Sequence, residues 1–322
     1  MGATKTEKKK LPVYKRAGFG TIIVFVLLVI VFSLISDAFL TLNNIMTILQ
    51  QNSALIIMSM GMTMVIITGG IDLSVGGNMA LCSICATMLI RAYDLPILVG
   101  VLICLAVGSL VGLCNGICVT TLGIPPLLAT IGMDSVTRGL AYIICDGATI
   151  NKLPDNFKVL GRGYLFGVLP IAALIAAVVV IIYVLLQNHT AFAVRNYAIG
   201  GNEKAAFLSG VKTKQHLRCV YVLMGFTCGM AAYINASRLG VGLASVGADM
   251  SFDAVTASVL GGTSIAGGSG KVQRAVLGAL IIGVIFNGLT ILNVQSFEQQ
   301  VAKGLILILS IGVDTVRHRK AE

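Results

Sequence analysis

The sequence predicts an all-α integral membrane protein with about ten transmembrane helices in two related halves of five. Of the 322 residues, 57% are hydrophobic and only 11% are charged, whereas a soluble globular chain carries about 25% charged residues. Apolar runs long enough to cross a bilayer follow one another along the chain. These runs lack the period-two alternation of barrel strands, which excludes a closed barrel. The composition also excludes soluble enzymes and nucleic-acid binders.

Ten runs are expected to cross the membrane. The eighth is the weakest, because it is short and carries Asp253 and the pair Gly261–Gly262. A count of eight or nine spans therefore stays open. The expected spans are 18–36, 45–68, 74–91, 95–120, 124–144, 165–187, 215–236, 250–266, 275–292 and 298–316. This division gives a basic N-terminal tail (1–17), one membrane domain (18–316) with a polar loop at 188–216, and a C-terminal tail (317–322).

The positive charges predict the orientation of these spans. With ten spans and both termini in the cytoplasm, 16 of the 23 basic residues fall on the inner side, as the positive-inside rule requires. They are Lys5, Lys8, Lys9, Lys10, Lys15, Arg16, Arg195, Lys204, Lys212, Lys214, Arg218, Lys271, Arg274, Arg317, Arg319 and Lys320. Removal of the eighth span would place the basic C-terminal tail outside, so the ten-span arrangement is retained.

Glycine marks close packing and two breaks in the apolar runs. Gly108, Gly112 and Gly116 share one face of the fourth span, which favours a helix crossing inside the bundle over a subunit interface. The breaks at 68–77 and 260–270 occupy corresponding places in the two halves, as in a repeat built around a central path. At the first break Ser74 is expected to cap the third span, and Asp72 to serve its first turn. A tight helix hairpin and a direct substrate role both stay open for the breaks.

No ATP-hydrolysing or metal site is expected in this chain. Gly270-Lys271 resembles the end of a phosphate-binding loop, but Val272 follows it and the G-x-x-x-x-G-K-[ST] pattern is absent from the sequence. Cys82-x-x-Cys85 lies in an apolar run without a second cysteine pair, so helix packing is favoured over zinc binding. No cofactor is therefore assigned to the chain itself.

The polar loop contains a short amphipathic segment. A helix that begins near Asn202, which can cap it, and stops at Gly210 is expected there. Lys204, Lys212 and Lys214 make this segment basic. Contact with anionic lipid and docking of a protein partner both explain such a segment.

Three strings resemble one transporter family, the ribose/galactose-type ABC sugar importer permeases. AIGGNEKAAFLSGVKT at 198–213 is similar to the cytoplasmic coupling segment of that family, and GGIDLSVGG at 69–77 and VLGGTSIAGGSG at 259–270 are its other recognisable strings. The resemblance extends from about Leu40 to Asp314. The expected coupling residues are Asn202, Glu203, Ala205, Ala206 and Gly210, with Lys204 between the glutamate and the alanine pair.

The resemblance implies a permease subunit in a bacterial inner membrane. Two such subunits, identical or similar, would form the pathway, and two separate ATPase domains would bind ATP and magnesium and dock on the coupling helices. An extracytoplasmic binding protein would deliver a sugar, with a ribose-like pentose as the first expectation.

Polar residues in or beside the spans are candidates for a sugar path: Gln51, Asn52, Asp72, Asn115 and Asn287. Interhelical hydrogen bonding is the alternative for each of them. Lys152, Lys158 and Arg162, in the longest outer loop, are candidates for docking the binding protein, and a solvated loop is the alternative.

The competing function is an ion-coupled secondary transporter of a small polar solute. It would need carboxylates near the middle of the membrane, where only Asp134 and Asp253 are plausible. Asp134 lies four residues before Arg138, so a structural ion pair is predicted. Asp253 and Lys303 have no partner visible in the sequence.

Overall fold

The computed structural model describes residues 19–319, so the predicted N-terminal tail and residues 320–322 of the predicted C-terminal tail lie outside the described residues. Seven helices in the described part are long and apolar enough to cross a membrane. They are α2 (Leu42–Ile67), α3 (Val75–Tyr93), α4 (Ile97–Thr120), α5 (Pro126–Cys145), α7 (Ile171–His189), α10 (Thr213–Leu239) and α12 (Val272–Ile291). The chain is therefore an all-α, multi-pass membrane protein, as its composition predicts.

Three further helices occupy the remaining expected spans: α1 (Phe19–Ile35), α11 (Met250–Leu260) and α13 (Ser296–Arg319). The 11 residues of α11 cover about 16 Å, roughly half the hydrocarbon core of a bilayer. Gly262 ends this helix with a φ of 85°, and the chain returns through a glycine-rich loop. Because α11 alone is too short for a complete crossing, the ten-span, two-half arrangement stays a prediction.

Short elements make up the connections. The 3-10 helix η2 (Asp155–Lys158), α6 (Val159–Arg162) and the antiparallel strands β1 (Tyr164–Leu165) and β2 (Leu169–Pro170) lie between α5 and α7. Two short helices, α8 (Ala191–Gly201) and α9 (Glu203–Leu208), lie between α7 and α10.

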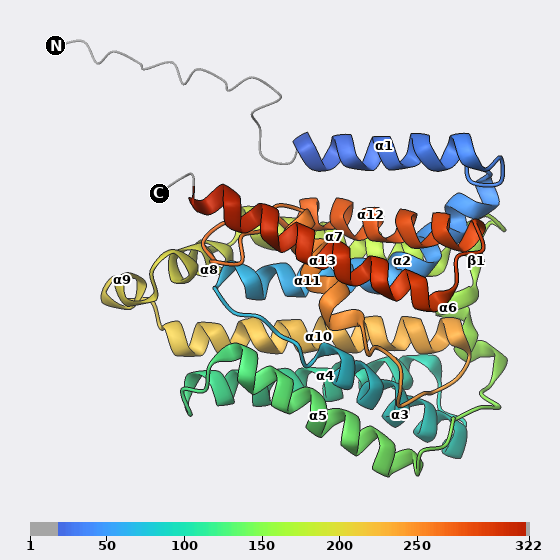
Figure 1. Ribbon diagram of the computed structural model, residues 1–322. Helices are drawn as coiled ribbons and strands as arrows, with labels where there is room; N and C mark the ends of the chain where they lie inside the picture. Colours follow the sequence, from blue (N-terminus) through green and yellow to red (C-terminus); the bar gives the residue numbers. More distant parts are fainter. Residues whose placement is uncertain (1–18, 320–322) are drawn as a thin grey trace.

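The long helices run side by side, with α1 and α5 at opposite edges and α2 and α10 in the middle (Figure 1). The interior is apolar: Ile57, Met60 and Ile66 of α2 and Met224 of α10 are fully buried. The start of α1, the end of α13 and the helix α9 lie at the same end of the bundle, and η2, α6 and the strand pair lie at the other end. Because the start of α1 and the end of α13 lie at the same end, this placement agrees with an even number of crossings, α1 and α13 included.

The glycines of α4 form a helix crossing inside the chain, as their spacing predicts. Gly108 lies against Gly225 of α10, and a Cβ atom on either residue would overlap the backbone of the other helix. Gly112 lies in the same way against the carbonyl group of Tyr221. The two helices approach closely because no side chain separates their backbones.

Candidate functional site: the coupling segment and the buried breaks

The segment expected to couple to an ATPase forms the short helix that its sequence predicts. Asn202 precedes α9, and its side-chain oxygen accepts a hydrogen bond from the backbone N–H of Ala205 at 2.9 Å. At the other end Gly210 has a φ of 87°, and its N–H donates to the carbonyl oxygen of Phe207 at 2.9 Å. A capping asparagine and a left-handed glycine thus bound the helix, for the local reasons that made both ends predictable.

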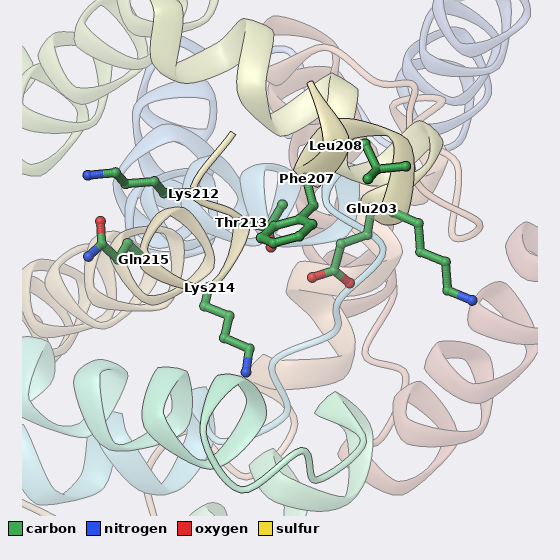
Figure 2. A pocket seen from close by; sticks show the side chains of 8 residues that line it. Glu203, Phe207, Leu208, Lys212, Thr213, Lys214 and Gln215 are labelled. Carbon is green, nitrogen blue, oxygen red and sulfur yellow. The ribbon is translucent and has the colours of Figure 1, made fainter. Parts of the chain in front are cut away.

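α9 presents charged and apolar side chains outward. Phe207 and Leu208 are 65% and 84% exposed, whereas Ala206 is buried against the rest of the chain. A groove of about 660 Å³ lies between α9 and the start of α10. The carboxylate of Glu203 and the ring of Phe207 lie beside this groove (Figure 2). The segment therefore offers a mixed apolar and charged surface that suits a protein partner.

Two of the five path candidates meet at the first glycine-rich break. Asp72 is 2% exposed and Asn115 is fully buried. The side-chain nitrogen of Asn115 lies 3.4 Å from both carboxylate oxygens of Asp72 and donates to the hydroxyl of Ser74 at 2.7 Å. Among the described residues, Asn115 Oδ1 and the hydroxyl of Tyr221 have no hydrogen-bond partner. The break is thus a polar island inside an apolar bundle.

Ser74 stands at the N-cap position of α3, as expected, but the expectation that its side chain caps the helix is wrong. The residue has helical backbone angles, and its side chain makes no capping hydrogen bond to α3. Its hydroxyl instead donates to Asp72 Oδ1 at 2.6 Å, and its backbone N–H donates to the same oxygen at 2.9 Å. The carboxylate of Asp72 attracts both donors because it is otherwise buried away from water.

The other three path candidates lie elsewhere. Asn287 and Asn44 exchange two amide hydrogen bonds, at 2.8 and 2.9 Å, between α12 and α2. Asn52 donates to the carbonyl oxygen of Ile48 at 2.7 Å and packs against Gly283 of α12. Gln51 is exposed on α2. The contacts of Asn287 with Asn44 and of Asn52 with Gly283 join α2 to α12, whereas the hydrogen bond of Asn52 lies within α2. The transport roles of all five residues stay predictions.

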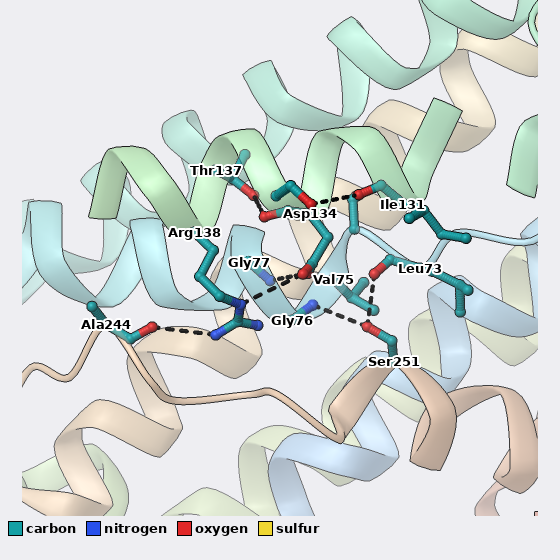
Figure 3. A network of polar contacts seen from close by, with 12 residues as sticks. Leu73, Val75, Gly76, Gly77, Ile131, Asp134, Thr137, Arg138, Ala244 and Ser251 are labelled. Carbon is teal, nitrogen blue, oxygen red and sulfur yellow. Dashed lines mark hydrogen bonds and ion pairs between the residues drawn. The ribbon is translucent and has the colours of Figure 1, made fainter. Parts of the chain in front are cut away.

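Polar contacts at the start of α3 were not foreseen from the sequence. The hydroxyl of Ser251 accepts from the N–H of Gly76 at 3.1 Å and donates to the carbonyl oxygen of Leu73 at 2.9 Å. Asp134 of α5 accepts from the N–H of Gly77 (Figure 3). A serine and an aspartate from distant helices thereby satisfy the free N–H groups at this helix start. These partners were not predictable because they lie 175 and 57 residues away in the sequence.

Asp134, Arg138, Asp253 and Lys303 form two ion pairs inside the bundle. Arg138 pairs with Asp134 at 3.5 Å, as predicted, and also donates to the carbonyl oxygen of Ala244 at 3.2 Å. Lys303 of α13 pairs with Asp253 of α11 at 2.9 Å. Both plausible intramembrane carboxylates are therefore neutralised by basic side chains.

The outer-loop candidates differ in their surroundings. Lys158 pairs with Asp155 at 2.8 Å, which lowers the pKa of that carboxyl below its usual value. Arg162 donates to the carbonyl oxygens of Arg238 and Leu239, both at 2.6 Å, at the end of α10. Lys152 is exposed, with a φ of 56°. Arg162 thus closes a helix end, whereas Lys152 and Lys158 remain the better candidates for docking.

Comparison with known proteins decides the family. The family described as "branched-chain amino acid transport system / permease component" matches residues 44–312. The chain belongs to this family. It is 39% identical to the ribose import permease protein RbsC of Bacillus subtilis over 89% of both chains. It is 33% identical to the D-allose transport system permease protein AlsC of Escherichia coli, over 92% of this chain and 91% of the relative. The galactose/methyl galactoside import permease protein MglC of Haemophilus influenzae is 31% identical over 92% and 94%. No solved structure matches.

The family resemblance drawn from the three strings is thus confirmed. The family match begins and ends close to the limits expected from the sequence, Leu40 and Asp314. The two glycine-rich strings and the coupling string all fall inside it. This permease component is a membrane protein of a transport system.

Proposed function

We propose that this chain is the permease subunit of an ATP-binding-cassette importer for a sugar, with a ribose-like pentose as the first candidate. The observation that carries the proposal is the identity of 31–39% over about nine tenths of each chain to import permeases named for ribose, allose and galactose. The names of these relatives support a monosaccharide. They favour ribose first, because the ribose permease of Bacillus subtilis is 39% identical.

The partners follow from this proposal. Two ATPase domains dock on α9 and on its counterpart in a second permease subunit, and they bind ATP and magnesium. An extracytoplasmic binding protein delivers the sugar at the end of the bundle that holds η2, α6 and the strand pair. The membrane is the bacterial inner membrane, with α9 and both termini on the cytoplasmic side. The basic residues of the coupling loop support this orientation.

The half-buried ion pairs of the bundle weigh against the ion-coupled alternative. Such a transporter needs a carboxylate that binds or releases a cation during transport. Asp134 and Asp253 are each paired with a basic residue. Asp72, which is 2% exposed, is held by hydrogen bonds from Ser74 and Asn115.

Reconstitution tests the proposal. The permease is placed in liposomes with its cognate ATPase and binding protein, and uptake of labelled ribose, allose and galactose is measured. We expect uptake that requires internal ATP and the binding protein. Uptake by the permease alone, driven by a sodium or proton gradient, would establish the secondary-transporter function instead.

A further inference from the structure

Three glycine-rich segments meet at the α9 end of the bundle. They are the end of α8, the residues that follow α2, and the loop between α11 and α12. The N–H of Gly268 in that loop donates to the carbonyl oxygen of Ile67, the last residue of α2, at 2.9 Å. Gly200 of α8 lies against this hydrogen bond. A Cβ atom at position 200 would overlap the oxygen of Ile67 and come within 2.5 Å of the nitrogen of Gly268.

The contact is between backbones, so no side chain can yield when one segment moves. A Cβ atom on Gly267 would lie 3.0 Å from both the oxygen of Gly200 and the nitrogen of Gly69. Gly267 and Gly268 have φ values of 87° and 69°, which glycine adopts at little cost. Such close-packed backbones transmit displacement rather than absorb it.

α8 connects the contact of Gly200 directly to α9. Asn202, the cap of α9, donates its N–H to the carbonyl oxygen of Ala198 in α8 at 3.1 Å. The hydroxyl of Tyr197 donates to the carbonyl oxygen of Gly270 at 2.7 Å. The side chain of Asn196 lies 2.5 Å from the ring nitrogen of His216 in α10. α8 is thus held on one side by the glycine loop and on another by the helix that follows α9.

The two glycine-rich segments are also joined deeper in the bundle. The chain that leaves Ile67 leads to Asp72 and to Leu73, whose carbonyl oxygen accepts from Ser251 of α11 at 2.9 Å. The loop that holds Gly268 continues from the other end of α11. Two hydrogen bonds therefore connect the segment after α2 to α11 and its loop: one from Gly268 to Ile67 and one from Ser251 to Leu73.

We propose that Gly200 and Tyr197 are positioning residues that couple α9 to both glycine-rich breaks. A displacement of α9 then moves the end of α2 and the loop over residues 262–271 as one unit, and with them the polar island at Asp72. The inference rests on the proposed function, because an ATPase docked on α9 supplies the displacement. The contacts of Gly200 and Tyr197 then pass the movement of α9 to the two glycine-rich breaks.

Gly200→Ala, with Gly201→Ala as its matched control, tests the contact. Both glycines belong to α8 and gain the same helix propensity from alanine, but a Cβ atom on Gly201 meets no atom within 4 Å. In the reconstituted complex we expect Gly200→Ala to lower the number of sugars imported per ATP hydrolysed by about tenfold, a typical size for coupling between sites. Assembly with the ATPase and basal ATP hydrolysis should persist. Gly201→Ala should match the wild type in all three measurements.

Tyr197→Phe keeps the test independent of a folding defect, because it removes only one hydroxyl. The lost hydrogen bond should lower the same ratio by about fivefold, with the thermal midpoint of the complex nearly unchanged. Wild-type ratios in Tyr197→Phe, or equal ratios in the two alanine variants, would overturn the inference. A wild-type complex that imports no sugar with ATP would instead contradict the proposed function.

Discussion

A polar side chain inside an apolar bundle either lines a transport path or holds helices together. Its hydrogen-bond and ion-pair partners show which of the two roles it has. Lys303 is an example, because its ammonium lies 2.9 Å from Asp253, 3.8 Å from Asp249 and 4.9 Å from the centre of the Phe286 ring. These contacts join α13 to α11 and α12. Charges inside a membrane protein are costly unless they are paired or hydrogen-bonded.

The Lys303–Asp253 pair makes a prediction for stability. Lys303→Gln should leave the carboxylate of Asp253 without its closest cation and lower the stability by about 1–3 kcal/mol, since one partner of a mostly buried pair is removed. The double variant Asp253→Asn with Lys303→Gln should recover part of this loss. Thermal midpoints of the four proteins of the cycle in detergent measure the coupling. Strictly additive midpoint shifts would show that the pair contributes nothing.

At the scale of elements, short helices connect the long spans. α9 has only six residues, too few to be stable on their own. Its order depends on the cap at Asn202 and on the burial of Ala206. α11 is short for a different reason, because a glycine-rich loop replaces the rest of a span.

The cap at Asn202 makes a prediction for coupling. Asn202→Ala should destabilise α9 by about 1 kcal/mol and weaken co-purification of the ATPase with the permease. Asn202→Asp is the matched variant, since a carboxylate accepts the same hydrogen bond and should restore docking. Pull-down of the ATPase from detergent-solubilised membranes compares the two variants. Equal capture by Asn202→Ala and the wild type would contradict the role of the cap.

At the scale of the whole molecule, one edge of the bundle is packed less than the rest. α5 is the least buried of the seven candidate spans. Gly132 and Gly139, seven residues apart and therefore on one face, have open space where a Cβ atom would lie. Small residues on a membrane helix favour close approach of another helix. If the pathway is formed by two permease subunits, this face of α5 suits their contact.

The face of α5 makes a prediction for assembly. If the proposed pair of permease subunits meets at this face, Gly132→Leu combined with Gly139→Leu should convert the dimer to monomer without lowering expression, because the added side chains meet no atom of their own chain. Ala177→Leu, at an exposed position of α7, is the matched control and should remain dimeric. Light scattering coupled to size exclusion measures both masses. A dimer that survives the α5 substitutions would place the interface elsewhere.

Much of this protein was predictable, because the signals are local. Apolar length places the long helices, and the resemblance identifies the family. The asparagine and glycine at the ends of α9 predict that helix, since a cap acts on residues three positions away. The end of α11 was placed too late, at residue 266 instead of 260, because an apolar run does not show where its backbone leaves the helix.

The sequence by itself determined the membrane class, the short helix α9 and the ion pair of Asp134 with Arg138, whose members are four residues apart. Only the tertiary structure decided which buried polar residues share a site. Asn287 and Asp72 look alike as candidates, yet one pairs with Asn44 at a sequence distance of 243 residues and the other with Asn115. The meeting of Gly200 with Gly268 was equally hidden. A buried donor takes whichever acceptor the fold brings within about 3 Å, and that acceptor's place in the chain is set by packing rather than by local pattern.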